Sequence, residues 1–133
     1  MCSPETIKMA RGRAAQARGL RAEMLVAARL EAQGWAILAQ RMLTEAGEID
    51  LIASRAGLLA FVEIKLRDDL AAAAYALGSR QRARLLLAAE IWLGNNPGHG
   101  EVGIRFDVVL VDKAGQMRRI VDAFRGGDTW SGR

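Results

Sequence analysis

The sequence predicts an α/β fold in which a sheet of about five strands is sandwiched between helices. Residues 49–54 and 58–66 are apolar on both strand faces over most of their length, which is typical of strands covered on both sides. Strong helix formers occupy residues 20–33 and 80–93, on either side of these strands in the chain. With 133 residues, the chain has the size of one domain.

The composition is basic and contains one cysteine. The net charge is +4, the sequence pI is about 10.0, and arginine supplies most of the 19 basic residues. Arginine grips phosphate at two points, so this bias suits a nucleic-acid partner, although +4 is also an ordinary solubility charge for a small domain. Because Cys2 is the only cysteine, the sequence excludes a disulfide framework and a metal site built from several thiolates.

No apolar run is long enough to cross a bilayer, and the N-terminus lacks the apolar core of a signal peptide. We therefore expect a cytoplasmic protein with no membrane association.

The first helix is expected over residues 20–33. Helix formers begin near residue 13, but Gly19 is a candidate break, and Gly34 suits the left-handed residue that ends a helix. Glu23 shares the apolar stripe of this helix, so it either faces a cleft or lies at the edge of the stripe and pairs with Arg18 or Arg21 in solvent.

The remaining elements follow from alternating or periodic apolar residues. Strands are expected at residues 35–42, 49–54, 58–66, 103–112 and 117–124, with a hairpin joining the second and third. The second helix should begin after Ser79 as its cap and end at the Asn-Asn-Pro-Gly run of residues 95–98. Arg105 and Asp107 are expected to pair with each other.

Three charges stand inside the apolar central strands. Asp50 follows Ile49, whereas Glu63 and Lys65 continue a strand face that begins with apolar residues. Burying an ion costs several kcal/mol, so such charges are expected to be paired, metal-bound or lining a cleft.

Two carboxylates and a lysine at this place suit phosphodiester hydrolysis. Asp50 and Glu63 offer the oxygen ligands that Mg²⁺ or Mn²⁺ prefers, and the Ile64 carbonyl is the natural third ligand. Lys65 would orient water or stabilise the phosphate oxygens. An ion-pair network without metal, in which Lys65 bridges the two acids, is the structural alternative.

Several arginines are candidates for nucleic-acid binding. Arg80, Arg82 and Arg84 cluster at the start of the second helix, where free N–H groups favour an anion, although a solvated face explains them equally well. Arg67 extends the charged face of the third strand, and Arg41 precedes the second strand.

Four motifs together resemble the bacterial UPF0102 (YraN-like) family. They are residues 47–53 (GEIDLIA), 61–67 (FVEIKLR), 105–109 (RFDVV) and 122–124 (DAF), preceded by Gly19 and Glu23. That family is similar to the PD-(D/E)xK nuclease superfamily, particularly junction resolvases and restriction enzymes.

The resemblance implies a restriction-endonuclease-like α/β/α core with a mixed central sheet. It implies a single endonuclease-like domain over residues 1–133, with a core at about 13–125 and flexible ends. Asp50 and Glu63 then become metal ligands and Lys65 the catalytic lysine. Glu23 takes the place of an acid from the first helix, and Gln81 that of a polar residue assisting the site.

The expected function is therefore that of a Mg²⁺-dependent nuclease acting on DNA, with branched DNA as a candidate substrate. A non-catalytic nucleic-acid-binding or accessory protein that retains the fold is the alternative. Junction-cutting members of the superfamily work as dimers, so a homodimer is a further expectation. One departure concerns the segment before the GEID motif, where relatives carry Asn and Arg and this chain has Arg41 and Leu43.

Overall fold

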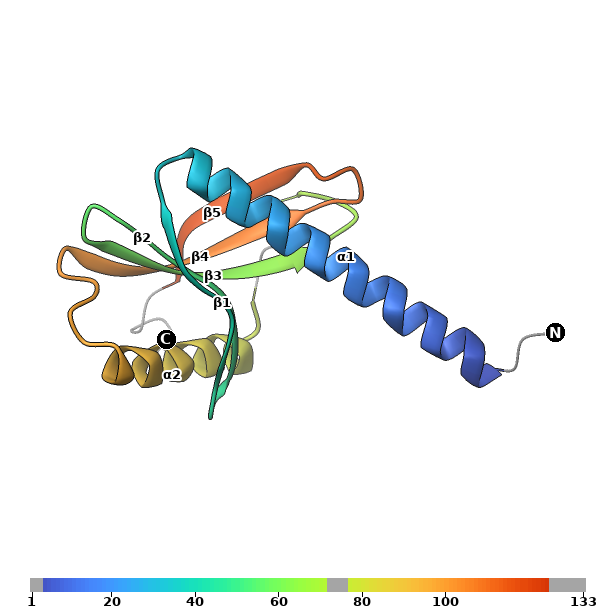
Figure 1. Cartoon of the computed structure of the whole chain (residues 1–133), viewed down its shortest axis with the longest axis horizontal. Helices are drawn as coiled ribbons and strands as arrows, with labels where there is room; N and C mark the ends of the chain where they lie inside the picture. Colours follow the sequence, from blue (N-terminus) through green and yellow to red (C-terminus); the bar gives the residue numbers. More distant parts are fainter. Residues whose placement is uncertain (1–3, 72–76, 125–133) are drawn as a thin grey trace.

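A computed structural model describes residues 4–71 and 77–124, which form one five-stranded sheet and two helices (Figure 1). The strands follow one another across the sheet in chain order; β3 and β4 are parallel, and every other neighbouring pair is antiparallel. The predicted α/β class with a mixed sheet is confirmed. The elements in order are α1 (Pro4–Ala32), β1 (Ala36–Thr44), β2 (Gly47–Arg55), β3 (Leu58–Leu66), α2 (Ser79–Asn95), β4 (Gly103–Val111) and β5 (Met117–Phe124).

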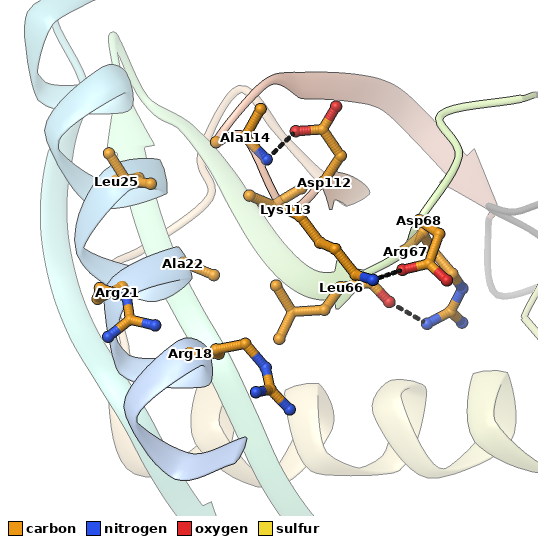
Figure 2. A pocket seen from close by; sticks show the side chains of 12 residues that line it. Arg18, Arg21, Ala22, Leu25, Leu66, Arg67, Asp68, Asp112, Lys113 and Ala114 are labelled. Carbon is orange, nitrogen blue, oxygen red and sulfur yellow. Dashed lines mark hydrogen bonds and ion pairs between the residues drawn. The ribbon is translucent and has the colours of Figure 1, made fainter. Parts of the chain in front are cut away.

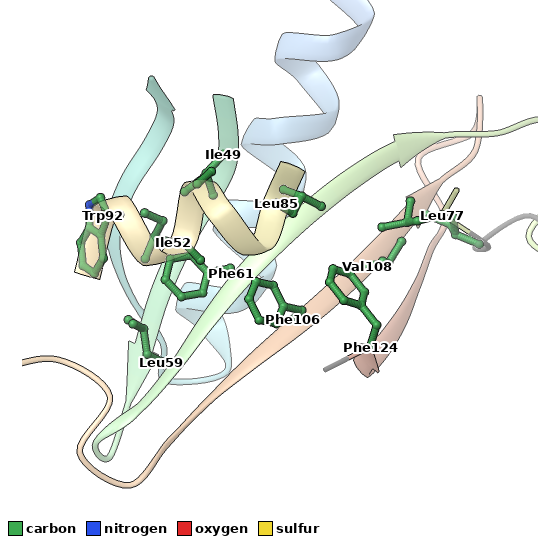
Figure 3. Packing of buried hydrophobic residues seen from close by; sticks show 13 residues of the cluster. Ile49, Ile52, Leu59, Phe61, Leu77, Leu85, Trp92, Phe106, Val108 and Phe124 are labelled. Atoms are coloured by element: carbon green, nitrogen blue, oxygen red, sulfur yellow. The ribbon is translucent and has the colours of Figure 1, made fainter. Parts of the chain in front are cut away.

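The two helices cover opposite faces of the sheet. Parallel neighbours need a crossover connection, and α2 lies on the path from β3 to β4. Its buried side chains, including Leu85 and Trp92, pack against Phe61 and Phe106 in one apolar cluster (Figure 3). Ala22, Val26 and Leu30 of α1 belong to the second cluster, on the other face. Side chains of β3 enter both clusters, which explains its apolar character on both faces.

Helix α1 is longer than predicted. It starts at Pro4, and Gly19 lies inside it, because helix formers on both sides outweigh the modest cost of one glycine. The helix ends as expected at Gly34, where φ is +91° and the Trp35 N–H donates to the Leu30 carbonyl. The N-terminal half of α1 extends beyond the sheet (Figure 1).

The predicted cap of α2 is wrong. Ser79 is already helical, and the residue before the first turn is Gly78, which offers no side-chain hydrogen bond. The helix ends at Asn95, as the run of residues 95–98 predicts, and the Asn96 side chain donates to the Trp92 carbonyl at 2.9 Å.

The strand predictions are confirmed to within two residues at each end, and β3 and β5 match at both ends. Ala56 and Gly57 join β2 to β3 with φ of +51° and +83°, which is the two-residue hairpin turn expected there. Neither helix, within the chain that the structure describes, has the length and hydropathy of a bilayer-spanning segment. Residues 126–133, predicted as a flexible tail, lie outside the described residues.

Candidate functional site

The site is built where β2 and β3 stop pairing. Their antiparallel register runs from the hairpin turn as far as the pair Leu51–Val62, and Asp50 and Glu63 are the next residues on the two strands. Beyond this pair the Ile64 N–H of β3 donates its hydrogen bond to a side chain of β2, the Asp50 carboxylate Oδ2, at 2.8 Å. The two predicted acids are therefore neighbours at the edge of the paired region.

Asp50 is strained electrostatically. Burial, followed by the nearby charge of Glu63, raises the pKa of the Asp50 carboxyl from its ordinary value of 3.8 to about 6. The charges of Glu23 and Glu48 act in the same direction, and the bond from the Ile64 N–H opposes them. A pKa so displaced by burial and a like charge is typical of functional sites.

Glu63 is buried, with 6% of its surface exposed, and three polar side chains surround it. Its Oε1 lies 3.3 Å from the Lys65 ammonium and accepts a hydrogen bond from Gln81 at 3.1 Å. Its Oε2 is 3.9 Å from the Arg84 guanidinium and accepts no hydrogen bond from any described residue. One buried carboxylate oxygen thus retains its capacity to bind a ligand.

Lys65 and Gln81, both predicted site residues, contact the Glu63 carboxylate. Lys65 follows Glu63 by two residues on the same strand face, and Gln81 projects from the first turn of α2. Arg84 was expected as a phosphate-binding residue only, and its contact with Glu63 was missed. Its position three residues after Gln81, and therefore on the same side of α2, was the available signal.

Gly47 makes room for Arg84. Arg84 Nη1 donates to the Glu48 carbonyl at 2.9 Å, and a Cβ on Gly47 would lie 2.7 Å from the same nitrogen. Gly47 also has φ of +131°, which disfavours any other residue. The first glycine of the GEID motif is thus explained by the approach of a side chain from α2.

Glu23 faces the site from α1, but its ionic partner differs from both that were considered. It pairs with Arg41 at 2.9 Å, across from β1, and not with Arg18 or Arg21. Arg41 itself has φ of +51°, which is unusual for a residue other than glycine and often marks a functional region.

A pocket of about 210 Å³ lies beside Asp50, and Glu63, Gln81 and Arg84 are not among the residues that line it. Glu23 from α1, Asp50 from β2 and Lys65 from β3 meet there, together with five further residues. The full lining is Gly19, Ala22, Glu23, Asp50, Ile64, Lys65, Leu66 and Arg67.

The remaining predicted arginines differ in their availability. Arg67 and Arg80 are exposed, and Arg67 lines the pocket. Arg82 is half-buried, and its Nε has no hydrogen-bond partner among the described residues. Arg41 and Arg84 are held by acids or carbonyls of the site. Arg67 and Arg80 are therefore the most exposed of these five arginines together with Arg41, which is engaged by Glu23.

The oxygen donors of the site fit a hard divalent cation that takes only a few of its ligands from the protein. No group of three or more His, Cys, Asp or Glu side chains in the described residues is arranged to hold a metal. Two carboxylates with a backbone carbonyl are nevertheless a sufficient set for Mg²⁺, which keeps several of its waters. The buried Glu63 oxygen without a hydrogen bond and the repulsion that raises the pKa of Asp50 are both features that a cation would relieve.

A second buried acid, Asp107, lies apart from this pocket. Its carboxylate is fully buried and pairs with Arg105, as predicted, at 3.0 Å, and with Arg119 of β5 at 2.7 Å. The Asp122 N–H donates to it as well. The guanidinium groups of Arg105 and Arg119 also lie over the Trp35 ring. Both Asp107 carboxylate oxygens accept at least two hydrogen bonds from the protein, so this cluster joins β4 and β5.

Comparison with known proteins places the chain among bacterial relatives. The model of the family described as "Uncharacterised protein family UPF0102" matches residues 22–111. A UPF0102 protein of Granulibacter bethesdensis is 55% identical over 118 residues, which cover 89% of this chain and 75% of the relative. One from Azorhizobium caulinodans is 47% identical over 121 residues, covering 91% of this chain and 92% of the relative.

Proposed function

The chain belongs to the UPF0102 family, and from its site we propose that it is a Mg²⁺-dependent nuclease, or a nuclease-like nucleic-acid-processing protein, with branched DNA as the expected substrate. The observation that carries this proposal is the pair Asp50 and Glu63. The pKa of Asp50 is raised by burial and by the charge of Glu63, and Glu63 keeps a buried oxygen without a hydrogen bond. Membership of the PD-(D/E)xK superfamily is part of the same proposal.

Asp50, Glu63 and the Ile64 carbonyl would hold the cation. When bound, Mg²⁺ or Mn²⁺ supplies a water of lowered pKa and neutralises negative charge on the phosphate. The residues fit this task because the two carboxylates adjoin each other at the edge of the paired region of β2 and β3. Hard oxygen donors are what such cations prefer.

Lys65 has two tasks in this proposal. Its ammonium lies 3.3 Å from Glu63 Oε1, so without substrate it balances the charge of the site. With a phosphodiester in the pocket, the same ammonium would donate hydrogen bonds to the oxygens on which negative charge develops. Because Lys65 lines the pocket beside Asp50, it needs no large movement to do so.

Gln81 and Glu23 act on the position of other groups. Gln81 donates to Glu63 Oε1 and so fixes the orientation of that carboxylate. Glu23 lines the pocket and is itself held by Arg41. A water between Glu23 and the phosphate would be oriented by this carboxylate.

One observation favours the alternative of a non-catalytic nucleic-acid-binding protein. Lys65, Gln81 and Arg84 already surround Glu63, so an ion-pair network can satisfy most of this carboxylate without a metal. In that case the basic surface would bind nucleic acid with an affinity that falls steeply with salt, and no strand would be cut.

The deciding experiment is cleavage of branched, flapped and linear DNA in the presence of Mg²⁺ or Mn²⁺. We expect the wild-type protein to cut at least one of these, and Asp50→Ala and Lys65→Ala to lose the activity. Glu101→Ala is a matched control, because Glu101 is an exposed acid outside the site. Cutting that is no greater with the wild type than with Asp50→Ala would contradict the enzymatic proposal.

Location and assembly complete the proposal. A nuclease acting on cellular DNA would work in the cytoplasm, and symmetric cutting of a junction would require a homodimer. Light scattering with and without a DNA junction tests the second point.

A further inference from the structure

A larger groove adjoins the candidate site. Its volume is about 860 Å³, and it lies between α1 and the region where β3 and β4 end (Figure 2). Ala22, Leu66 and Arg67 line both this groove and the smaller pocket that holds Asp50. The groove therefore adjoins the pocket that Glu23 and Asp50 line, whereas Glu63 lines neither cavity. The other lining residues are Arg18, Arg21, Leu25, Asp68, Val111, Asp112, Lys113, Ala114 and Gly115.

The charges of the groove favour an anion. Its two acids are engaged: Asp68 pairs with Lys113 at 3.5 Å, and Asp112 accepts the N–H groups that hold the turn before β5. Arg18 and Arg21 make no ion pair within the described residues, and both are exposed. Figure 2 shows the Arg18 side chain extending from α1 toward Leu66, and Arg21, one turn along α1, also lines the groove. Two cations on one helix wall thus remain free for a ligand.

The floor of the groove is aliphatic. Leu25 and Leu66 are large apolar side chains exposed to solvent at 44% and 39%, and the buried Val111 also lines the groove. Unpaired bases bind by stacking on aromatic rings or on arginine guanidinium planes, and the lining of this groove offers the second kind of surface. Phosphate-binding arginines on the wall and an apolar floor together match a nucleotide with its base unpaired.

We propose that this groove binds one unpaired nucleic-acid strand and leads it to the carboxylate pocket. A cavity of about 860 Å³ falls in the range of about 300–1,000 Å³ typical of sites for small ligands. A volume of this size accommodates a nucleotide or two of a single strand. The inference rests on the proposed function and specifies its substrate as flapped or frayed ends.

Binding of a fluorescein-labelled oligothymidylate of about 20 nucleotides, followed by anisotropy in EDTA, tests the groove without any cleavage. The full chain is used, and Arg21→Ala is compared with Arg29→Ala. Both are exposed arginines of α1, but Arg29 does not line the groove. Alanine preserves the helix, so both variants should fold.

We expect Arg21→Ala to weaken strand binding about fivefold at about 0.1 M salt, since each lost phosphate contact changes the salt slope by about 0.7. The double variant Arg18→Ala, Arg21→Ala should lose about 20-fold on the same basis. Arg29→Ala should bind as the wild type does, and a duplex of equal length should bind less tightly than the single strand.

Three results would overturn the proposal: equal binding by Arg21→Ala and Arg29→Ala, equal or tighter binding of the duplex, or equally effective competition by polyglutamate. The last would indicate an acidic polypeptide as the occupant. Cleavage assays on the same variants separate the two proposals. Loss of strand binding in Arg21→Ala, with no cutting even by the wild type, would uphold the groove and contradict the nuclease. Cutting by the wild type, with unchanged strand binding in Arg21→Ala, would uphold the nuclease and contradict the groove.

Discussion

The Asp50 carboxylate accepts a hydrogen bond from the Ile64 N–H at 2.8 Å, and these residues lie one and two positions beyond the last pair of β2 and β3, Leu51–Val62. A side chain thereby replaces a strand-to-strand backbone bond at the edge of the site. Burial and the nearby charge of Glu63 disfavour the charged form of this carboxylate, whereas the hydrogen bond from the Ile64 N–H favours it.

The first prediction concerns stability and pH. The raised pKa of Asp50 means that the folded chain holds a proton between about pH 3.8 and 6, where the unfolded chain has released it. The stability contributed by this group is therefore present below pH 3.8 and lost as the pH rises through 6. The loss is up to about 3 kcal/mol, at about 1.4 kcal/mol for each pKa unit.

Asp50→Asn should remove this dependence. The amide can still accept the Ile64 N–H through its oxygen, but it carries no charge at any pH. We expect the variant to be more stable than the wild type at pH 8 and nearly equal to it at low pH, as measured by urea unfolding. A variant that is less stable than the wild type at pH 8 would show that burial and the nearby charge of Glu63 do not destabilise the charged form of Asp50.

The second prediction concerns metal binding. Calorimetric titration with Mn²⁺ or Mg²⁺ should give a site-specific heat at pH 8 that is absent in Glu63→Gln. Because the pKa of Asp50 is about 6, affinity should fall as the pH drops below that value. Asp68→Asn is the control, since Asp68 is an exposed acid outside the carboxylate pocket. Unchanged heat in Glu63→Gln would favour the ion-pair network without metal.

The third prediction concerns Gly47. An alanine there must adopt φ of +131° and would bring its Cβ to 2.7 Å from Arg84 Nη1. We expect Gly47→Ala to lower the free energy of unfolding by at least about 1–3 kcal/mol and to displace Arg84 from Glu48. Gly94→Ala is the matched control in α2, because its Cβ meets nothing within 4 Å. That variant should gain up to about 1 kcal/mol from helix propensity.

The fourth prediction concerns the second buried acid. Asp107→Ala leaves Arg105 and Arg119 without their shared partner, and we expect a loss of about 3 kcal/mol or more in urea unfolding. Asp68→Ala removes an ion pair in which both side chains are more than four-fifths exposed, so its effect should be near zero. Similar losses in the two variants would show that burial does not govern these pairs.

The sequence predicts most of the fold because its strands are strongly patterned. The face of β3 that changes from Phe61 to Glu63 locates the site by alternation alone, and the hairpin at Ala56 and Gly57 follows from its spacing. Predictions of helix ends from single residues were wrong at two positions. Gly19 does not break α1, and Ser79 does not cap α2.

Long-range partners could not be predicted from spacing. Arg41 meets Glu23 from 18 residues away, and Arg119 meets Asp107 from 12 residues away across a strand pair. Each contact depends on the register of the sheet and the placement of α1 on it. The local pair Arg105–Asp107 was therefore predicted, whereas the pair Glu23–Arg41 and the contribution of Arg119 were not.

The β2–β3 hairpin has a consequence for the order of folding. It carries Asp50, Glu63 and Lys65, so both acids come together as soon as this local hairpin closes, whereas Gln81 and Arg84 arrive only with α2. We therefore expect like-charge repulsion to oppose hairpin closure until the helix docks. Arg84→Ala should slow folding more than it speeds unfolding if docking occurs in the transition state, and the reverse result would place docking after it.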